Sequence, residues 1–436
     1  MDPAMIGFWG IAILIVLLIL GFPVFIAMAV TGTVGFYVIT GNVGGAGALA
    51  AGMAYSVGST YEFSVMPFFI LLGMIVYESG TATSIYEAAY RWVGKIPAGL
   101  GIATCLAVAF FSAVSGSSMA CAVTFSKIAI PQLVSKGYNK SLACGLIAGA
   151  ATQDALIPPS ALLVIYAIVT EQSIGKCLMA GFLPGLLSCL LYIIALVILG
   201  IYRTDWVPRG ASFTMKEKVE SLKGAWQIPL LAVIILYAIY SGICTPTEAA
   251  GFGTFVALVM AASLVGFKRL NLRQSLRSTV ISSTMIYAIL FGAFVFGSFM
   301  SVSNIPNMLS NIIKTAGLGR EVVLAIIIIL YFVMGCFMSP TAMVVISMPI
   351  FFPVITALRY DPIWFGIIVV KMAGIGMLTP PVGMSVYAVK GTVKDLCPLE
   401  DIFKGSMIFL IMDLITLFLL IIFPSISTIL PDMMGK

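Results

Sequence analysis

The chain has 436 residues, of which 61% are hydrophobic and 9% are charged, and its formal net charge is +6 at pH 7. Globular domains of this size cannot bury so much apolar surface, so the composition predicts a multi-pass membrane protein without a sizeable soluble domain. The chain has no histidine and no GxxxxGKS/T phosphate loop, which excludes Ser-His-Asp triads, HExxH metal centres and P-loop ATP hydrolysis. We therefore do not expect an enzyme.

Taken in chain order, the apolar runs predict about ten membrane spans and two re-entrant helical hairpins. Each half would contain three spans, a hairpin and two spans, with hairpins at about 98–135 and 322–358. If the first half begins outside the membrane and the second half begins inside, 17 of the 23 Lys and Arg residues lie on the inner side. Cytoplasmic loops are expected to be enriched in these residues. The expected fold is an all-α polytopic membrane protein with a first inverted repeat, 1–202, a cytoplasmic amphipathic linker, 203–226, and a second inverted repeat, 227–436.

Landmarks recur in the two halves at an offset of about 222 residues, which indicates an internal duplication. Ser117 matches Ser339, Tyr138 matches Tyr360, and the Leu-Ile-Pro-Pro sequence at 156–159 matches Leu-Thr-Pro-Pro at 378–381. The Ile-Ala-Ile-Pro sequence at 128–131 aligns with 346–349 at an offset of 218, which requires a four-residue insertion before Tyr360. Inverted halves of this kind are the layout of many secondary transporters.

Two polar segments are expected to lie at the membrane surface. Residues 213–226 alternate apolar and lysine side chains at mostly helical steps, which predicts a helix lying flat on the inner leaflet. Residues 86–95 are similar and are expected to brace the first hairpin. Membrane-surface basicity explains both segments better than nucleic-acid binding does.

Four segments inside the apolar runs must interrupt a helix. They are the tips of the two hairpins, 115–118 and 338–341, and two Pro-Pro breaks, 156–160 and 379–383. Irregular backbone survives in a bilayer only where it lines a cavity or binds something. Proline can also merely kink a span, but the recurrence of a tip and a break in each half favours function. Carbonyls freed at the breaks, with hydroxyls such as those of Ser117 and Thr379, suit a hard monovalent cation, and half-helix N-termini such as the one after Ser339 suit an anion.

Ionisable residues inside the spans are further candidates. Asp154 and Lys371 precede the two breaks, and they are interpreted either as functional groups, including a possible pair between the halves, or as a structural pair or snorkelling lysine. Asp413 lies within the last span with no identified partner. Thr245 and Glu248 fit a capping box at the start of a helix, with Pro246 at its first position.

These motifs together resemble the large membrane (M) subunit of tripartite ATP-independent periplasmic (TRAP) transporters. The resemblance covers essentially the whole chain and is most specific in four stretches: Leu-Ile-Pro-Pro-Ser at 156–160, Ala-Gly-Phe-Leu-Pro-Gly-Leu at 180–186, Thr-Pro-Thr-Glu-Ala-Ala at 245–250 and Thr-Pro-Pro-Val-Gly at 379–383. It implies an elevator-type fold of the ion-transporter class and sodium-driven import of a small organic acid across the bacterial inner membrane. The implied partners are a small four-helix membrane (Q) subunit and a periplasmic substrate-binding protein.

The resemblance also implies where sodium, the transported coupling ion, would bind. The residues implied for sodium site 1 are Ser115, Gly116, Ser117, Ser118, Ile157, Pro158, Pro159 and Ser160. Those implied for sodium site 2 are Met338, Ser339, Pro340, Thr341, Thr379, Pro380, Pro381 and Gly383. Substrate would lie between the two sites, and the candidates for binding it or for coupling are Asp154, Lys371, Ser117, Ser339 and Thr341. Asp154 and Lys371 fall where relatives are expected to have a small or amide residue.

Three other functions fit parts of the pattern. A stand-alone cation-coupled anion symporter of a related class would need the same hairpins but no partners. An intramembrane enzyme would use Asp154 or Asp413. A channel would conduct without interruption, so its currents would saturate poorly with substrate.

Overall fold

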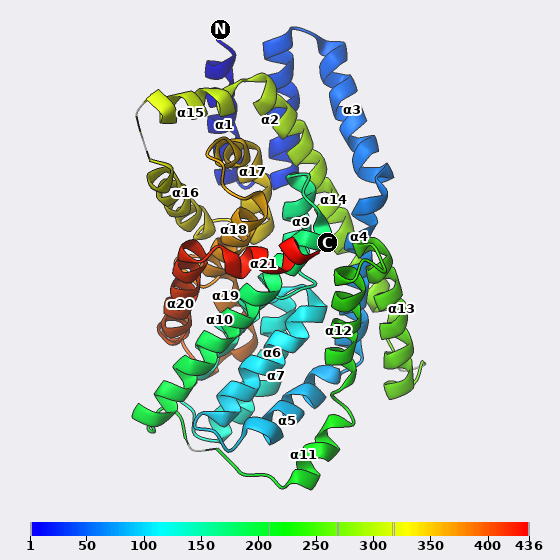
Figure 1. Ribbon diagram of the computed structural model, residues 1–436, viewed down its shortest axis with the longest axis vertical. Coiled ribbons are helices and arrows are strands. Elements are labelled where there is room, and N and C mark those ends of the chain that lie inside the picture. Colours follow the sequence, from blue (N-terminus) through cyan, green and yellow to red (C-terminus); the bar gives the residue numbers. More distant parts are fainter. Residues whose placement is uncertain (1, 209, 268–269, 316, 318, 435–436) are drawn as a thin grey trace.

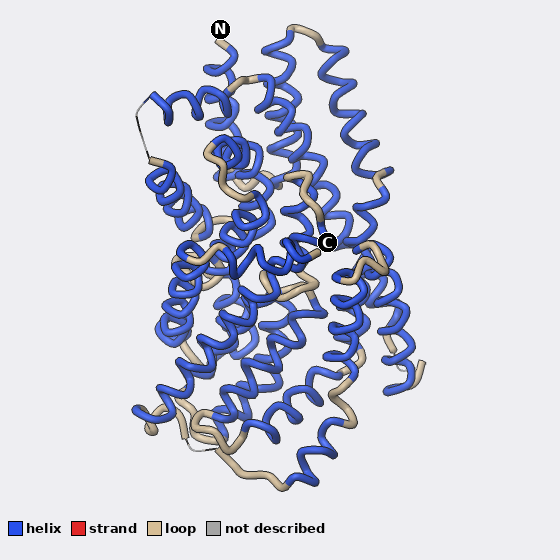
Figure 2. Tube along the Cα trace, in the orientation of Figure 1, coloured by secondary structure: helices blue, strands red, loops and turns tan. Residues whose placement is uncertain are grey.

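The computed structural model describes residues 2–208, 210–267, 270–315, 317 and 319–434, without the side chains of 113–115, 310 and 312–314. This described part consists of helices and connecting loops and contains no strand (Figure 2). The all-α expectation is confirmed. A helix satisfies its own backbone hydrogen bonds, which is what a chain this apolar requires in a bilayer.

The first half of the chain forms ten α-helices and two short 3₁₀ helices. Several begin where an Asn or Ser side chain accepts a hydrogen bond from the first turn, as at Asn42, Asn139, Ser160 and Ser173. The elements are α1 (Pro3–Ile19), α2 (Val24–Thr40), α3 (Val43–Ser59), η1 (Tyr61–Ser64), α4 (Val65–Glu78), α5 (Thr81–Val93), α6 (Gly99–Ser115), α7 (Ser118–Ser135), α8 (Lys140–Ala151), η2 (Thr152–Ala155), α9 (Ala161–Val169) and α10 (Ile174–Tyr202).

The linker contains one helix, and the described residues of the second half form ten α-helices and one 3₁₀ helix. The linker helix is capped by Thr214, whose side chain accepts from the N–H of Glu217 while the Glu217 carboxylate accepts from the N–H of Thr214. The elements are α11 (Met215–Leu222), α12 (Gln227–Tyr240), α13 (Pro246–Val265), α14 (Leu272–Val302), α15 (Ile305–Thr315), α16 (Arg320–Gly335), α17 (Pro340–Ala357), α18 (Pro362–Gly376), α19 (Met384–Val393), η3 (Lys394–Leu396), α20 (Leu399–Ile422) and α21 (Ser425–Met433).

The helices of the two halves correspond at the offset read from the sequence. Shifted by 222 residues, the bounds of α7 become 340–357, which are the bounds of α17, and α8 and α18 then both begin at 362. The expected insertion before Tyr360 is wrong. At the constant offset, Pro131 in α7 corresponds to Pro353 in α17, which carries interior prolines at both 349 and 353. Pro131 therefore corresponds to Pro353 and not to Pro349.

Seven described helices are long and apolar enough to cross a membrane, or eight if the bent pair α11 and α12 counts as one span. Two of the seven, 118–135 and 340–357, are the second arms of the expected hairpins. Several expected spans are shorter apolar helices, among them α1, α2 and α18. One Pro-Pro break divides α8 from α9, and the other divides α18 from α19. None of these four helices is by itself long enough to count as a span. The ten-span topology with re-entrant hairpins therefore stays a prediction.

The helices pack into two groups. In the first, here called the α2–α14 group, α1–α4 pack with α12–α14; in the second, here called the hairpin group, α6–α10 pack with α16–α21. Within the hairpin group α8 crosses α20 at backbone contact, because a methyl group on Gly145 would clash with the backbone of Gly405 and Ser406. Figure 1 shows the two hairpins apart in this arrangement, α6 and α7 towards the lower end and α16 and α17 towards the upper end.

The connections between the groups lie at opposite ends of the molecule. Helix α15 lies near the upper end of Figure 1, and α5 and α11 lie together near the lower end. Helix α5 packs against α6, in agreement with the expected brace on the first hairpin. Arg91 Nη1 and Trp92 Nε1 of α5 donate to the carbonyls of Glu217 and Lys218 of α11, at 3.3 and 3.1 Å. The linker is thus attached to the helix that leads into the first hairpin.

Candidate functional site

The tip of the first hairpin contacts the first Pro-Pro break. Ser117 caps α7 by accepting from the N–H of Ala120 at 3.4 Å, and Ser118 Oγ donates to Asp154 Oδ1 at 2.5 Å. A Cβ on Gly116 would lie 3.9 Å from Ala161 Cβ and 4.0 Å from the carbonyl oxygen of Pro159. The side chain of Ser115 lies outside the described residues. The tip and the break expected to form site 1 are therefore neighbours.

The break itself turns the chain between α8 and α9. Ser160 caps α9 by accepting from the N–H of Leu163 at 3.4 Å, and its hydroxyl donates to the carbonyl of Ala155 at 2.6 Å. The Pro158–Pro159 bond is cis, as is the Pro380–Pro381 bond of the second half. Ile157 packs at the edge of the core, and Ser160 is buried. A hydroxyl that donates its proton keeps lone pairs on the oxygen, so Ser118 and Ser160 can still act as cation ligands.

The tip of the second hairpin is built in the same way. Ser339 caps α17 by accepting from the N–H of Ala342 at 3.3 Å, Pro340 occupies the first helical position, and Thr341 follows it. Met338, the preceding residue, packs against the core. Gly335, the last residue of α16, lies against Gly376, where a Cβ would approach the Gly376 Cα to 3.0 Å. Since Gly376 ends α18, the second hairpin is fastened directly to the second broken helix.

At the second break the chain changes direction with the help of the Thr379 hydroxyl and of Gly383. Thr379 Oγ1 donates to the carbonyl of Ile375 at 2.8 Å and is buried. Gly383 takes a left-handed backbone conformation, φ +45°, at the start of α19, where a side chain would be strained. Ser385 Oγ then donates to the carbonyl of Ala148 in α8 at 2.6 Å. The break of one half is therefore tied to the broken helix of the other.

The two tip-and-break pairs lie in one group of helices and interlock. Helix α7 packs against α19, α9 packs against α17, and η2 packs against α18. Gly374 and Thr152 lie at one contact between the two broken helices, since a Cβ on Gly374 would lie 3.6 Å from the carbonyl oxygen of Thr152. These contacts define two clusters: the first tip meets the first break at Gly116 and Ser118, and the second hairpin meets the second broken helix at Gly335 and Gly376. The binding of sodium at either cluster stays a prediction.

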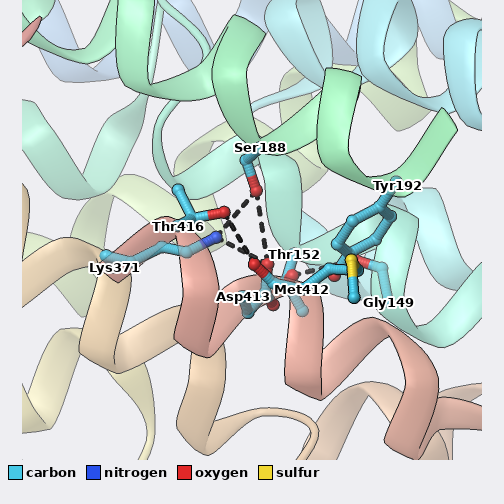
Figure 3. Close-up of polar contacts among 8 residues, drawn as sticks. All are labelled: Gly149, Thr152, Ser188, Tyr192, Lys371, Met412, Asp413 and Thr416. Carbon is cyan, nitrogen blue, oxygen red and sulfur yellow. Dashed lines mark hydrogen bonds and ion pairs between the residues drawn. The ribbon is translucent and has the colours of Figure 1, made fainter. Parts of the chain in front are cut away.

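A buried ion pair joins three helices beside these clusters (Figure 3). Lys371 Nζ of α18 lies 2.6 Å from Asp413 Oδ1 of α20, and the two side chains are 5% and 1% exposed. Lys371 Nζ also donates to Ser188 Oγ of α10 at 2.8 Å, and Ser188 Oγ donates to Asp413 Oδ1 at 3.2 Å. The contacts of this triangle offset part of the cost of burying both charges, although Asp413 Oδ2 has no hydrogen-bond partner among the described residues. Lys371 therefore pairs with Asp413, and the pair with Asp154 considered from the sequence is wrong.

The ion pair adjoins the first break through a second set of contacts. Tyr192 of α10, whose ring packs at 5.0 Å from that of Phe409, donates to the carbonyl of Gly149 at 3.4 Å. Thr152 Oγ1 donates to the same carbonyl at 2.8 Å (Figure 3). This carbonyl near the end of α8 thus has two side-chain donors besides the backbone N–H of Thr152. The sequence alone gives only a weak indication of this ion pair, because all it shows is that Lys371 and Asp413 are opposite charges within two apolar helices of the same half.

The capping box at the start of α13 is confirmed. Thr245 Oγ1 accepts from the N–H of Glu248 at 3.3 Å, and a Glu248 carboxylate oxygen accepts from the N–H of Thr245 at 2.8 Å. Pro246 stands at the first helical position. The box satisfies two backbone donors that the first turn leaves unpaired, so Thr245 and Glu248 are structural residues.

A large cleft lies between parts of the two groups of helices. Its volume is about 1170 Å³, and its lining comes from both groups: the η1 segment and α14 on one side, the end of α9 and the middle of α17 on the other. Polar lining residues include Thr245, Ser298 and Asn307. Its charged residues are Glu62 and Glu171, and no Lys or Arg lines it in the part of the chain that the structure describes.

The family of the chain follows from comparison with known proteins. Residues 11–426 match the family described as the tripartite ATP-independent periplasmic transporter, DctM component. The chain belongs to this family. It is 33% identical over 382 residues to the C4-dicarboxylate TRAP transporter large permease protein DctM of Pseudomonas aeruginosa, covering 86% of this chain and 87% of the relative. It is 30% identical to the ectoine TRAP transporter large permease protein TeaC of Halomonas elongata, covering 97% and 98%.

Other relatives and solved structures extend this picture. The sialic acid TRAP transporter large permease protein SiaM of Vibrio cholerae is 31% identical over 380 residues, covering 86% of this chain and 87% of SiaM. The fold is similar to that of the YdaH transporter of Alcanivorax borkumensis, with a TM-score of 0.52, 13% identity and 87% of each chain covered. MtrF of Neisseria gonorrhoeae gives a TM-score of 0.51 and 16% identity, covering 82% and 80%. The chain is a large permease subunit of a TRAP transporter, so the resemblance read from its motifs is confirmed.

Proposed function

We propose that this subunit imports a small organic acid across the bacterial inner membrane in symport with sodium, by an elevator movement of the hairpin group. Family membership supports the transport role and the dependence on a substrate-binding protein. The names of the relatives include a dicarboxylate, ectoine and a sialic acid as substrates, so membership leaves the substrate open.

The observation that carries sodium coupling is the pairing of each hairpin tip with a broken helix. Each half has hydroxyl oxygens at its tip and at its break, where the backbone leaves a helix: Ser117, Ser118 and Ser160 in the first half, Ser339 and Thr379 in the second. Hydroxyl and carbonyl oxygens are ligands that hard cations accept. Capped N-termini at Ser117 and Ser339 add partial positive charge where a substrate carboxylate would lie between the two cations.

The elevator movement is supported by the division into two groups with a cleft between them. Under this proposal the α2–α14 group stays fixed while the hairpin group carries the filled sites past it. The matching order of helices at a constant offset of 222 residues supports two inverted repeats, one hairpin from each, opening to opposite faces. A filled site, in which cation and anion charges balance, costs less to move through lipid than an empty one.

Two partners are part of the proposal: a periplasmic substrate-binding protein and a small membrane subunit (Q). The latter is supported by the isethionate TRAP transporter permease protein DctMQ of Oleidesulfovibrio alaskensis, to which this chain is 28% identical while covering 54% of its length. Copurification of a co-expressed small membrane subunit is the expected result. A chain that purifies alone and transports without partners would instead be a stand-alone cation-coupled symporter.

The test is uptake by proteoliposomes that contain the full assembly and receive loaded binding protein. An inward sodium gradient should drive uptake, and replacing sodium with potassium should abolish it. A protonophore serves as the control, because sodium-driven uptake should survive it. Undiminished uptake driven by a pH gradient without sodium would contradict the proposal and would implicate protons and Asp154.

A further inference from the structure

The turn that leaves each hairpin is built alike in the two halves. Gly137 and Arg359, at the offset of 222, both take a left-handed backbone conformation, with φ of +89° and +58°. A tyrosine follows each, and the N–H groups of Tyr138 and Tyr360 donate to the carbonyl five residues earlier, at 3.0 and 3.2 Å. An arginine adopts this conformation only at a cost, so the turn is kept in the second half with a residue that disfavours it. The two tyrosines are therefore structurally equivalent.

In the first half the tyrosine closes the base of the hairpin by a buried, neutral contact. The Tyr138 hydroxyl accepts from the N–H of Gly101 at 3.1 Å. Gly101 is the third residue of α6, where a backbone donor has no partner within the helix, and a Cβ there would lie 3.4 Å from Tyr138 Cε1. Tyr138 is 5% exposed, and the N–H of the next residue, Asn139, donates to the carbonyl of Trp206 in the linker at 2.9 Å. The linker therefore helps to cover this base.

In the second half the equivalent tyrosine makes an exposed, ionic contact. The Tyr360 hydroxyl donates to Glu321 Oε2 at 2.8 Å, and Arg320 Nε lies 2.8 Å from Glu321 Oε1. The Arg320 guanidinium also lies over the Tyr360 ring at 5.3 Å, and that ring stacks on Trp364 of α18 at 5.3 Å. The side chains of Arg320 and Glu321 are 60% and 68% exposed. Tyr360 thus joins the end of α17 to the first turn of α16, as Tyr138 joins α7 to α6.

The second cluster is too enclosed to be filled without movement of the hairpin. Thr379 at the break and Cys336 just before the tip are both 7% exposed. Gly335 packs against Gly376 so closely that a Cβ on Gly335 would lie 3.0 Å from the Gly376 Cα. An ion that enters this cluster needs the tip to leave the break, and a pair of helices makes such a movement by turning at its base. A bond between the two arms at that base restrains the movement.

We propose that Tyr360 and Glu321 form a clasp at the base of the second hairpin that limits how often its tip leaves the second break. The inference rests on the proposed transport function and deepens it, because Tyr360 becomes a positioning residue that acts through the hairpin without touching the cargo. The charge-based topology places both ends of this hairpin on the outer face, from which cargo arrives. Exposed contacts between charged groups are weak, so the clasp breaks and re-forms readily, as repeated entry of cargo requires.

The test measures how fast N-ethylmaleimide labels Cys336 in the purified membrane assembly without sodium, by mass spectrometry of the peptide that contains it. Tyr360→Phe removes the hydroxyl and keeps the ring on Trp364, and it should raise the labelling rate about threefold, as expected for loss of an exposed contact to a charge. Glu321→Ala should do the same. Because both remove one hydrogen bond, the double variant should label no faster than the faster single variant. Tyr237→Phe, exposed on α12, is the matched control and should label like the wild type.

Tyr138→Phe shows whether the effect belongs to the second hairpin, because it removes the equivalent hydroxyl from the first. It should leave the labelling of Cys336 at the wild-type rate. The proposal is overturned if Tyr360→Phe and Glu321→Ala both label at the wild-type rate, if their effects add in the double variant, or if Tyr138→Phe raises the rate equally. Failure of the proposed function would look different: sodium would then fail to slow the labelling of the wild type, while the clasp variants would still label faster than it does.

Discussion

The Lys371–Asp413 pair allows a sharp test of the packing of the hairpin group. In Lys371→Met the ammonium is lost while the Asp413 carboxylate remains, with its side chain 1% exposed in the wild type. Ser188 can still donate to Asp413, but one neutral hydrogen bond does not replace a charge at 2.6 Å. Removing one partner of a buried pair typically costs about 3–5 kcal/mol. The near-complete burial of both side chains and the hydrogen-bonded triangle place the expected loss in that range.

The double variant Lys371→Met/Asp413→Leu supplies the comparison. Both charges are then absent, side chains of similar volume remain, and the Ser188 hydroxyl can turn to a carbonyl of its own helix. Replacement of a buried pair by apolar residues is often neutral or stabilising. We therefore expect the double variant to recover most of the stability that Lys371→Met loses. The measurement is unfolding of the detergent-solubilised assembly, with Asp413→Leu completing the double-mutant cycle.

Two results would refute this reasoning. If Lys371→Met unfolds like the wild type, the ammonium does not compensate the carboxylate in the way that the distances indicate. If the double variant is as unstable as Lys371→Met, the loss comes from side-chain packing around α18 and not from an unpaired charge.

Three further predictions concern the tips, a helix cap and the linker. Ser117→Ala and Thr379→Ala should each raise the sodium concentration for half-maximal uptake, because each removes one oxygen; an unchanged requirement in both would contradict the assigned clusters. Thr245→Ala should cost about 1 kcal/mol of stability through loss of the cap, measured by the same unfolding assay. The hydrogen bond from the backbone N–H of Thr214 lowers the pKa of Glu217 below that of an ordinary glutamate. The cap should therefore stabilise helix α11 fully above the ordinary glutamate pKa, and this stabilisation should be lost as the pH falls through the lowered pKa of Glu217. Circular dichroism of the wild type and Glu217→Gln from pH 7 to about pH 3 checks this, since the variant should lack that pH dependence.

Much of the candidate site follows from local chemistry and was accessible to sequence reasoning. Two prolines in succession remove two backbone donors, so the breaks after α8 and α18 had to occur. Serine before a helix makes a cap, and Ser117, Ser160 and Ser339 all act in this way. The spacing of tips and breaks also gave the offset at which the helices correspond.

The sequence-based predictions were wrong where more than one residue satisfied the same local requirement for a proline position or a charge partner. Pro349 and Pro353 are equally acceptable prolines inside α17, and only the bounds of the helix decide which one corresponds to Pro131. Lys371 is near enough in sequence to the second break to suggest a pair with Asp154. Its actual partner depends on which faces of α18 and α20 meet, and that choice is made by close crossings such as the one of α8 with α20 at Gly145 and Gly405.

The sequence by itself determined the membrane class, the family, the positions where helices begin and break, and the residues that cap them, because each of these depends on contiguous residues and their own backbone. The tertiary structure decided the partner of Lys371, the meeting of Ser118 with Asp154, and the acidic lining of the cleft between the two groups. Those features join segments far apart in the chain, as Ser188 joins Asp413 across 225 residues. A buried charge takes whichever partner the packing of whole helices brings within hydrogen-bonding distance.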